Sequence, residues 1–363
     1  MYSVPWARTA ERPNKQRHNP PMQDFASAAM VRLLVRAVAA HGLVPPPPPP
    51  GADGLAASHV PLAYKRSVVE AVLHQGGLGT LLQLAQQVDL LAGDPVHRAL
   101  LGATCVPELL TRWQRLERYV HSRHQVSILA SAPGTLALHH HARPGVLETP
   151  LPTESLAVLG VLMGASHAMG VRGLQVDLGA PEAPAQRVNL RIGVPATAPT
   201  ELHAQLAPLA AQGQMGHWTL RWEVHTDEGK APVAPALEPQ PATHLCDALP
   251  WPPLAHQLAR HVLQDPAAQH TVDALAQHTG LARRSLQRAL TERGLSCRHI
   301  VTEARARLAA QWLLDSPHGL AEIGFACGFA DQPHFTREFA RHVGLTPARY
   351  RQAFAGVIAS GGG

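Results

Sequence analysis

The most constraining feature of the sequence is a short plan that occurs twice near the C-terminus, at residues 271–290 and again at 319–339. In each copy, apolar residues at helical spacing are followed by a glycine, Gly280 or Gly328, and then by a second segment with a polar outer face. Because glycine adopts the left-handed backbone of a sharp turn, each copy predicts two short helices joined tightly. That is the layout of a helix-turn-helix, whose second helix enters the DNA major groove.

The first copy leaves a basic stripe on its second helix. Thr271 can cap the first helix, and Leu275, Leu286 and Leu290 are spaced to face a common core. Four polar side chains remain on the open side: Arg283, Arg284, Gln287 and Arg288. Arginine reads guanine O6 and N7 and glutamine reads adenine N6 and N7, so this helix is predicted to contact bases. The alternative interpretation is a solvated basic face on an ordinary amphipathic helix.

The second copy offers a different surface. Its second helix is expected to start near Asp331 or Gln332, because Pro333 is tolerated only in the first turn. Phe335 and Phe339 lie four residues apart and are predicted to be core. The candidate DNA-contacting side chains are Gln332, His334, Thr336 and Arg337. The histidine of this set is interpreted either as a contact to phosphate or base or as an exposed side chain.

A longer helix is predicted between the two copies, from about Cys297 to Leu314. At about 1.5 Å per residue it would span roughly 27 Å. Successive major-groove segments on one face of DNA lie about 34 Å apart, so this helix could hold the two second helices near that separation. A last helix is expected after Thr346, which is an N-cap followed by Pro347.

The stretch Ala321-Glu-Ile-Gly-Phe-Ala-Cys-Gly-Phe-Ala-Asp-Gln-Pro-His-Phe-Thr-Arg-Glu-Phe339, followed by Gly344-Leu-Thr-Pro-Ala-Arg-Tyr-Arg351, closely resembles the C-terminal signature of AraC/XylS-type bacterial transcription regulators. The resemblance covers about residues 253–354. It implies two helix-turn-helix units, joined by a long helix, that bind adjacent major grooves of double-stranded DNA. It also implies that the polar positions named above in both second helices face the bases.

This chain departs from the family pattern in the second unit. Members often carry a serine where it has Ala330 or Asp331, and a freer residue where it has Pro333. These departures put the base and phosphate contacts of the second helix in doubt. The resemblance further implies RNA polymerase as a partner, with a small-molecule effector and a homodimer as further candidates.

The first 225 residues predict a helical layer followed by a mixed α/β portion. Helical spacing occurs at residues 25–42, 62–119 and 156–169, with breaks at 76–77 and 93–95. Strands are predicted at residues 126–130, 135–141, 174–178, 188–192 and 218–224, the first two forming a hairpin. This half is more weakly similar to the arabinose-binding-type sensing domain of one AraC-type subgroup.

The chain is therefore predicted to be α+β, with a mixed sensing domain and an all-α DNA-binding domain. The expected boundaries are a disordered tail at 1–24, a sensing or dimerisation domain at 25–225 with a proline-rich loop at 44–51, a linker at 226–252, the DNA-binding domain at 253–356 and a tail at 357–363. The proline run is interpreted as an expanded low-complexity spacer; the alternative is a ligand for a proline-binding module.

Charge and cysteine usage agree with this interpretation. The net charge of +5 and the pI near 9.3 indicate a polyanion partner, and the excess is arginine, with a biased source genome as the alternative explanation. The four cysteines lie far apart, without zinc-finger spacing or a disulfide framework, and predict reduced thiols in the cytoplasm. We expect neither a signal peptide nor a membrane span.

Other candidate chemistry is sparse. His139 and His141 would share one strand face and could hold a metal ion, or they could be an exposed strand end. Cys105 or Cys246 could be a sensing thiol, but neither has an evident cationic neighbourhood. No nucleotide-binding, hydrolase or metalloprotease motif occurs, so no enzyme activity, metal or cofactor is predicted.

The leading hypothesis is a sequence-specific transcription regulator whose N-terminal domain senses a small molecule. A second hypothesis places an enzyme in the N-terminal half, with DNA binding as targeting. A third is a ligand-independent regulator whose N-terminal domain only dimerises. The sequence leaves the effector, the operator and the choice between activation and repression open.

Overall fold

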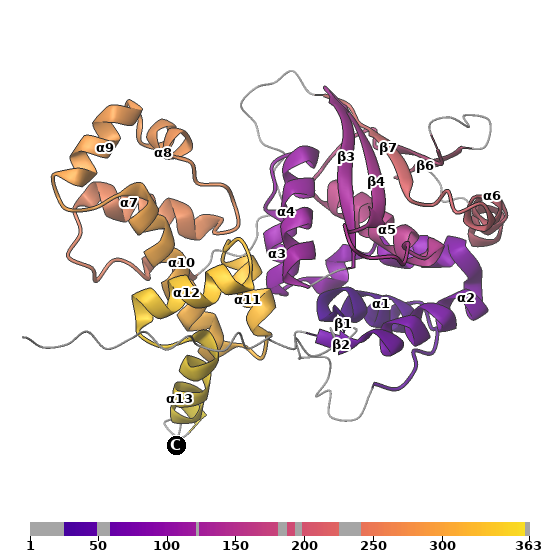
Figure 1. Ribbon diagram of the computed structural model, residues 1–363, viewed down its shortest axis with the longest axis horizontal. Coiled ribbons are helices and arrows are strands. Elements are labelled where there is room, and N and C mark those ends of the chain that lie inside the picture. Colours follow the sequence, from indigo (N-terminus) through magenta and orange to yellow (C-terminus); the bar gives the residue numbers. More distant parts are fainter. Residues whose placement is uncertain are drawn as a thin grey trace, which may run out of the picture.

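The computed structural model describes residues 25–48, 59–120, 123–180, 187–192, 198–224 and 241–359. Its N-terminal region combines helices with an antiparallel sheet, and its C-terminal region is helical (Figure 1). The predicted α+β class is therefore confirmed. The tail expected at 1–24 lies outside the described residues, as does most of the expected linker. In the part of the chain that is described, no helix is long and apolar enough to cross a membrane.

Five predicted strands form the sheet of the N-terminal region. They are β3 (His124–Ala132), β4 (Thr135–Ala142), β5 (Gln175–Leu178), β6 (Val188–Arg191) and β7 (His217–Arg221), in the order β3-β4-β7-β5-β6. All neighbours are antiparallel. Along β4, Leu136, Leu138 and His140 are buried while the residues between them are half-buried. This alternation places one sheet face in the core and leaves the other partly open.

Helices cover the buried face of the sheet. They are α1 (Ala28–Ala40), α2 (Leu62–Ala85), the 3-10 helix η2 (Val88–Leu91), α3 (Pro95–Leu101), α4 (Val106–Tyr119), α5 (Pro152–Ala168) and α6 (Pro199–Ala211). The two predicted breaks in the long helical stretch are confirmed. Gly77 has φ 72° inside α2, and Asp94 caps α3 by accepting a hydrogen bond from the Val96 amide at 2.8 Å.

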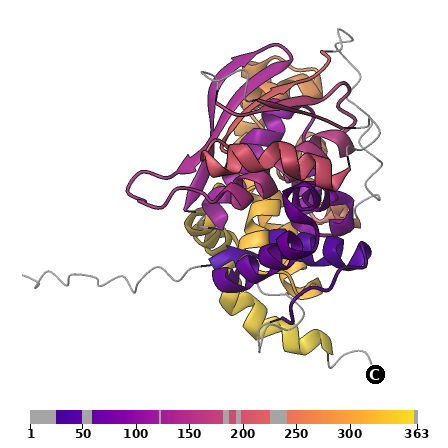
Figure 2. The same cartoon turned by 90° about the vertical axis from the view of Figure 1, so that its right-hand side faces the viewer.

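Two features of this region differ from the sequence prediction. The helix expected from Phe25 begins only at Ala28, because residues 25–27 form β1 and pair with β2 (His59–Pro61), a partner distant in sequence. Helix α6 was not predicted, since Pro199 and Pro208 mask its helical spacing. It lies beside α2, as Figure 2 shows.

Helix α5 is the centre of the N-terminal core. Every residue from 155 to 166 is buried except Val158, which is half-buried. Gly160 and Gly164 bring the end of α2 close: a Cβ on Gly164 would lie 2.1 Å from the Gln86 carbonyl oxygen, and one on Gly160 would lie 2.6 Å from the Ala85 Cβ. These positions therefore require glycine for steric reasons.

The C-terminal region contains seven helices among its described residues. They are α7 (Pro253–Gln264), α8 (Val272–Thr279), α9 (Arg283–Thr291), α10 (Cys297–Asp315), α11 (Leu320–Ala326), α12 (Gln332–Val343) and α13 (Pro347–Ala359). Residues 241–252, which the sequence assigned to the linker, begin with the 3-10 helix η4 (Pro241–His244), which lies against α7. Cys246 is buried there, and the Arg307 side chain donates to the Leu245 carbonyl.

Candidate DNA interface

The first helix-turn-helix, α8 and α9, forms as its sequence predicts. The Thr271 side chain accepts a hydrogen bond from the Ala274 amide at 3.1 Å and caps α8. Gly280 ends the helix with φ 68°, in the left-handed region. Leu286 and Leu290 on α9 are fully buried. The remaining side of α9 is thereby fixed toward solvent.

All four candidate side chains of α9 are exposed: Arg283, Arg284, Gln287 and Arg288. Two of them form surface ion pairs, Arg283 with Asp273 at 3.2 Å and Arg288 with Glu292 at 3.9 Å. Such exposed pairs contribute at most about 1 kcal/mol, so they can be exchanged for contacts with a polyanion at low cost. Among the described residues, the Arg284 guanidinium forms neither a hydrogen bond nor an ion pair.

The second helix of the second unit, α12, starts where its proline predicts. Asp331 is the N-cap and accepts from the His334 amide at 2.7 Å, with Pro333 in the first turn. Phe335 and Phe339 are fully buried, as expected. The candidates on this helix are less free than those on α9, because Gln332, Thr336 and His334 are half-buried and only Arg337 is fully exposed.

His334 has a structural role that the sequence did not reveal. Its Nδ1 accepts a hydrogen bond from the Ala330 amide at 3.1 Å, and its ring lies on Phe329 with 5.7 Å between centroids. Burial lowers the pKa of this histidine, so it is neutral near pH 7. The side chains of Asp331 and His334 thus each accept a backbone N–H at the start of α12.

Helix α10 joins the two units. It has 19 residues, which corresponds to about 28 Å. Glu303 fixes it to α12 by accepting from His342 at 2.6 Å, and it also pairs with Arg307 at 2.7 Å. These hydrogen bonds hold the pKa of Glu303 below its usual range despite its burial. The long helix therefore positions α12 through a charged contact as well as through packing.

A buried ion triad ties the second unit to the N-terminal domain. Arg32 of α1 lies 2.6 Å from Asp94 and 2.6 Å from Glu322 of α11. All three residues are buried. Helix α11 packs against α3 and α4, as Figure 1 shows. The first helix of the second unit is thus held in the interface between domains.

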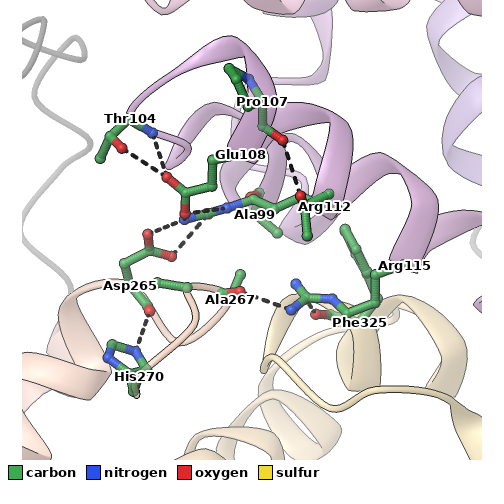
Figure 3. Close-up of polar contacts among 12 residues, drawn as sticks. Ala99, Thr104, Pro107, Glu108, Arg112, Arg115, Asp265, Ala267, His270 and Phe325 are labelled. Carbon is green, nitrogen blue, oxygen red and sulfur yellow. Dashed lines mark hydrogen bonds and ion pairs between the residues drawn. The ribbon is translucent and has the colours of Figure 1, made fainter. Parts of the chain in front are cut away.

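Helix α4 makes a second set of contacts across the same interface (Figure 3). Arg112 forms a bidentate pair with Asp265, with nitrogen–oxygen distances of 2.5 and 3.1 Å. Arg115 donates to the carbonyl oxygens of Ala267 at 2.8 Å and Phe325 at 3.3 Å. Bidentate arginine pairs fix orientation as well as distance, so α4 sets the angle between the domains.

The opposite side of α4 borders a cavity of about 140 Å³ inside the N-terminal domain. Trp113, Leu116 and Glu117 of α4 line it, together with Met30 and Leu33 of α1. Two of the helices that contact the C-terminal domain, α1 and α4, are therefore also walls of this cavity. No local sequence pattern predicts this cavity, because its lining residues come from segments far apart in the chain.

The other candidate residues of the sequence, two histidines and two cysteines, belong neither to the DNA interface nor to the lining of the cavity. His139 and His141 stack on one sheet face beside His217, with ring centroids 4.9 and 4.1 Å from that of His139. Across the described ranges, no group of three or more histidine, cysteine or acidic residues is arranged to hold a metal ion. Burial raises the pKa of Cys246 to about 11, while Cys105 is exposed.

The chain is similar in sequence and structure to several known proteins. Residues 275–353 match the family model described as a helix-turn-helix domain. The chain is 26% identical to the ornithine utilization regulator of Pseudomonas aeruginosa over 292 residues, which are 75% of this chain and 83% of that protein. It is 34% identical to the transcriptional regulator VirS of Mycobacterium tuberculosis over 100 residues, 28% of each chain. The crystal structure of the transcriptional regulator CdpR from Pseudomonas aeruginosa aligns with 89% of this chain and 98% of its own, at 17% identity and a TM-score of 0.30.

Proposed function

The chain is a DNA-binding transcriptional regulator with an AraC-type helix-turn-helix domain, not an enzyme, and on this premise we propose that α9 and α12 enter successive major-groove segments of one operator. Helix α9 reads bases through Arg283, Arg284, Gln287 and Arg288. Helix α12 uses Gln332, His334, Thr336 and Arg337 mainly to grip and orient the DNA.

This proposal rests on a difference in exposure between the polar side chains of α9 and those of α12. Helix α9 presents three arginines and a glutamine to solvent, all on one side of a helix whose other side is closed by a core. On α12 the corresponding side chains are half-buried, except Arg337. Base discrimination needs side chains that reach the groove edges, which favours α9 as the main reader.

Electrophoretic mobility shift with the promoter of the chain's own gene and of the adjacent operon tests the assignment. Arg284→Ala and Arg288→Ala are each expected to weaken binding by about 1–3 kcal/mol and to relax the preference at one base pair. Arg191→Ala is the matched control, because this exposed arginine of β6 carries the same charge far from α9. Unchanged affinity and preference in both α9 variants would exclude α9 as the reading helix.

A small-molecule effector in the N-terminal cavity is proposed to control DNA binding. Supporting this, α1 and α4 line the cavity with one side and hold the C-terminal domain with the other. A ligand shifts such an equilibrium only if it binds one arrangement of the domains more tightly than the other, and a ligand touching α1 and α4 would do so if these helices differ in position between the arrangements. The name of the Pseudomonas aeruginosa relative suggests an amino-acid utilisation pathway as the regulated process.

The alternative is a ligand-independent regulator whose N-terminal domain only forms a homodimer. A thermal-shift screen of metabolites, followed by mobility shift with each hit, separates the two proposals. Effector control predicts at least one compound that both raises the melting temperature and changes the DNA affinity. A dimeric protein that responds to no compound would favour the alternative. RNA polymerase is the proposed partner in either case.

A further inference from the structure

One buried carboxylate lines the N-terminal cavity with no cation at ion-pair distance among the described residues. Glu117 on α4 lines the cavity and is 5% exposed. Its Oε1 accepts hydrogen bonds from the Trp113 indole at 2.7 Å and from the Val126 amide at 3.1 Å. None of the ion pairs found among the described residues includes it. Since a carboxylate offers about four acceptor positions, Glu117 retains capacity for a further donor.

The cations of the lining are already matched. Arg123 lies 2.6 Å from Glu148, and Lys65 lies 3.6 Å from Glu154. Arg66 is exposed, so solvent screens its charge. Glu117 is therefore the buried carboxylate of the lining that forms no ion pair, and Arg118 and Arg143 act on it only from beyond ion-pair distance.

The two histidines of the lining do not change this balance. Burial lowers the pKa of His140 to about 3, and it lowers the pKa of His124 as well. His140 is held by Ser155 of α5, with 3.0 Å between its Nδ1 and the Ser155 hydroxyl. Both rings are neutral near pH 7 and supply no counter-ion to Glu117.

We propose that the cavity binds a small organic ammonium ion, a primary amine with an apolar body, whose ammonium group pairs with Glu117. A buried carboxylate is costly to leave without a counter-ion, so a cation that enters with its own hydrogen-bond donors is favoured. The remaining walls include Leu33, Leu100 and Leu116, which suit an apolar body. This inference rests on the proposed function, because the amine is the effector that the cavity would sense.

The volume sets the size of the ligand. A cavity of about 140 Å³ is close to the roughly 150 Å³ that accepts a six-carbon ring in an engineered apolar site. A linear amine with four to six carbons is therefore the expected class. Such a ligand would touch Glu117 and Trp113 on the inner side of α4, one turn or less from Arg112 and Arg115 on its outer side.

Calorimetry and thermal shift on the full-length protein test the ligand class. The probes are the linear alkylamines from propylamine to hexylamine, each compared with the carboxylate and the alcohol of the same chain length. We expect an amine to bind and to raise the melting temperature, while its carboxylate and alcohol do not. If no amine of the series binds, or if a carboxylate binds better than its amine, the inference is overturned.

Two carboxylate variants locate the bound ammonium. Glu117→Gln keeps an acceptor for Trp113 and removes only the charge, and it is expected to weaken amine binding about tenfold or more. Glu70→Gln is the matched control, and affinity should stay within about threefold because Glu70 is an exposed carboxylate of α2 outside the lining of the cavity. Thermal unfolding without ligand confirms that both variants fold. Equal amine affinity in wild type and Glu117→Gln would contradict the inference.

The pH dependence gives an independent readout that needs no variant. Burial raises the pKa of Glu117 to about 7. The charged groups that face it are Arg118 of α4 and Arg143 after β4. Elsewhere in the lining, Lys65, Arg66, Arg123, His124, His140, Glu148 and Glu154 face the cavity. The amine remains protonated from pH 6 to 8 while Glu117 ionises, so its affinity should rise roughly tenfold across that window. A flat profile would overturn the assignment to Glu117.

Electrophoretic mobility shift of the operator DNA, measured with and without the amine, tests effector control separately from the ligand class. If the amine binds at Glu117 but leaves DNA affinity unchanged, the ligand class stands and effector control by this cavity fails. If no amine binds while another compound changes DNA affinity, effector control stands and the ligand class is wrong.

Discussion

The buried triad of Arg32, Asp94 and Glu322 gives the sharpest prediction about how the domains are held. Arg32 is the only cation of the triad and contacts both carboxylates at 2.6 Å, so the three groups together carry one net negative charge. Arg32→Met would leave two buried carboxylates without their arginine, and Glu322 would keep only the imidazole of His318, 3.6 Å from its Oε2. Glu322→Gln would instead leave a neutral Arg32–Asp94 pair, with an amide still able to accept from Arg32.

The two variants should therefore differ strongly in stability. Removing one partner of a buried ion pair costs about 3–5 kcal/mol, which is the expectation for Arg32→Met. Glu322→Gln loses a charge-assisted hydrogen bond but also removes a surplus negative charge, so its cost should be about 1 kcal/mol or less. At about 2–4 °C per kcal/mol, Arg32→Met should lower the melting temperature by on the order of 10 °C.

Thermal unfolding of the full-length protein, followed by tryptophan fluorescence at pH 7, measures the difference. Arg191→Met is the control for loss of an exposed arginine and should shift the melting temperature by less than about 2 °C. The reasoning would be refuted if Glu322→Gln were as destabilising as Arg32→Met, or if neither differed from the control.

Two further predictions concern local packing and capping. Gly164→Ala should destabilise the N-terminal domain by several kcal/mol, because its Cβ would lie 2.1 Å from the Gln86 carbonyl oxygen; chemical denaturation measures this, and a change below about 1 kcal/mol would contradict the close approach of α2 and α5. Asp331→Ala should cost about 1 kcal/mol through loss of the cap on α12, while Asp331→Ser should restore most of it; equal stability of the two variants in urea titration would argue against the cap seen at the His334 amide.

Helix α4 contributes neighbouring residues to two different surfaces. On α4, Arg112 and Arg115 point toward the C-terminal domain, while Trp113 and Glu117 border the cavity. A helix rotates by about 100° per residue, so adjacent positions can serve two different surfaces. A small rotation or shift of α4 would change both surfaces together, which is the physical basis of the proposed control.

Much of the C-terminal domain could be predicted from sequence because its determinants are local. Gly280 stops α8, Asp331 and Pro333 start α12, and the spacing of Leu286 and Leu290 sets which side of α9 is exposed. Each of these depends on residues only a few positions apart, so periodicity and capping suffice. The strands of the N-terminal sheet were predictable for the same reason.

The sequence by itself thus determined the two helix-turn-helix units, the exposed polar positions of α9 and the α+β class. Only the tertiary structure decided which distant residues meet: β1 with β2, Arg32 with Glu322, and Glu117 with a cavity built from separate helices. Helical spacing predicts that a side chain faces inward, but not what it will face. That choice depends on long-range packing, because the residues that meet come from segments far apart in the chain.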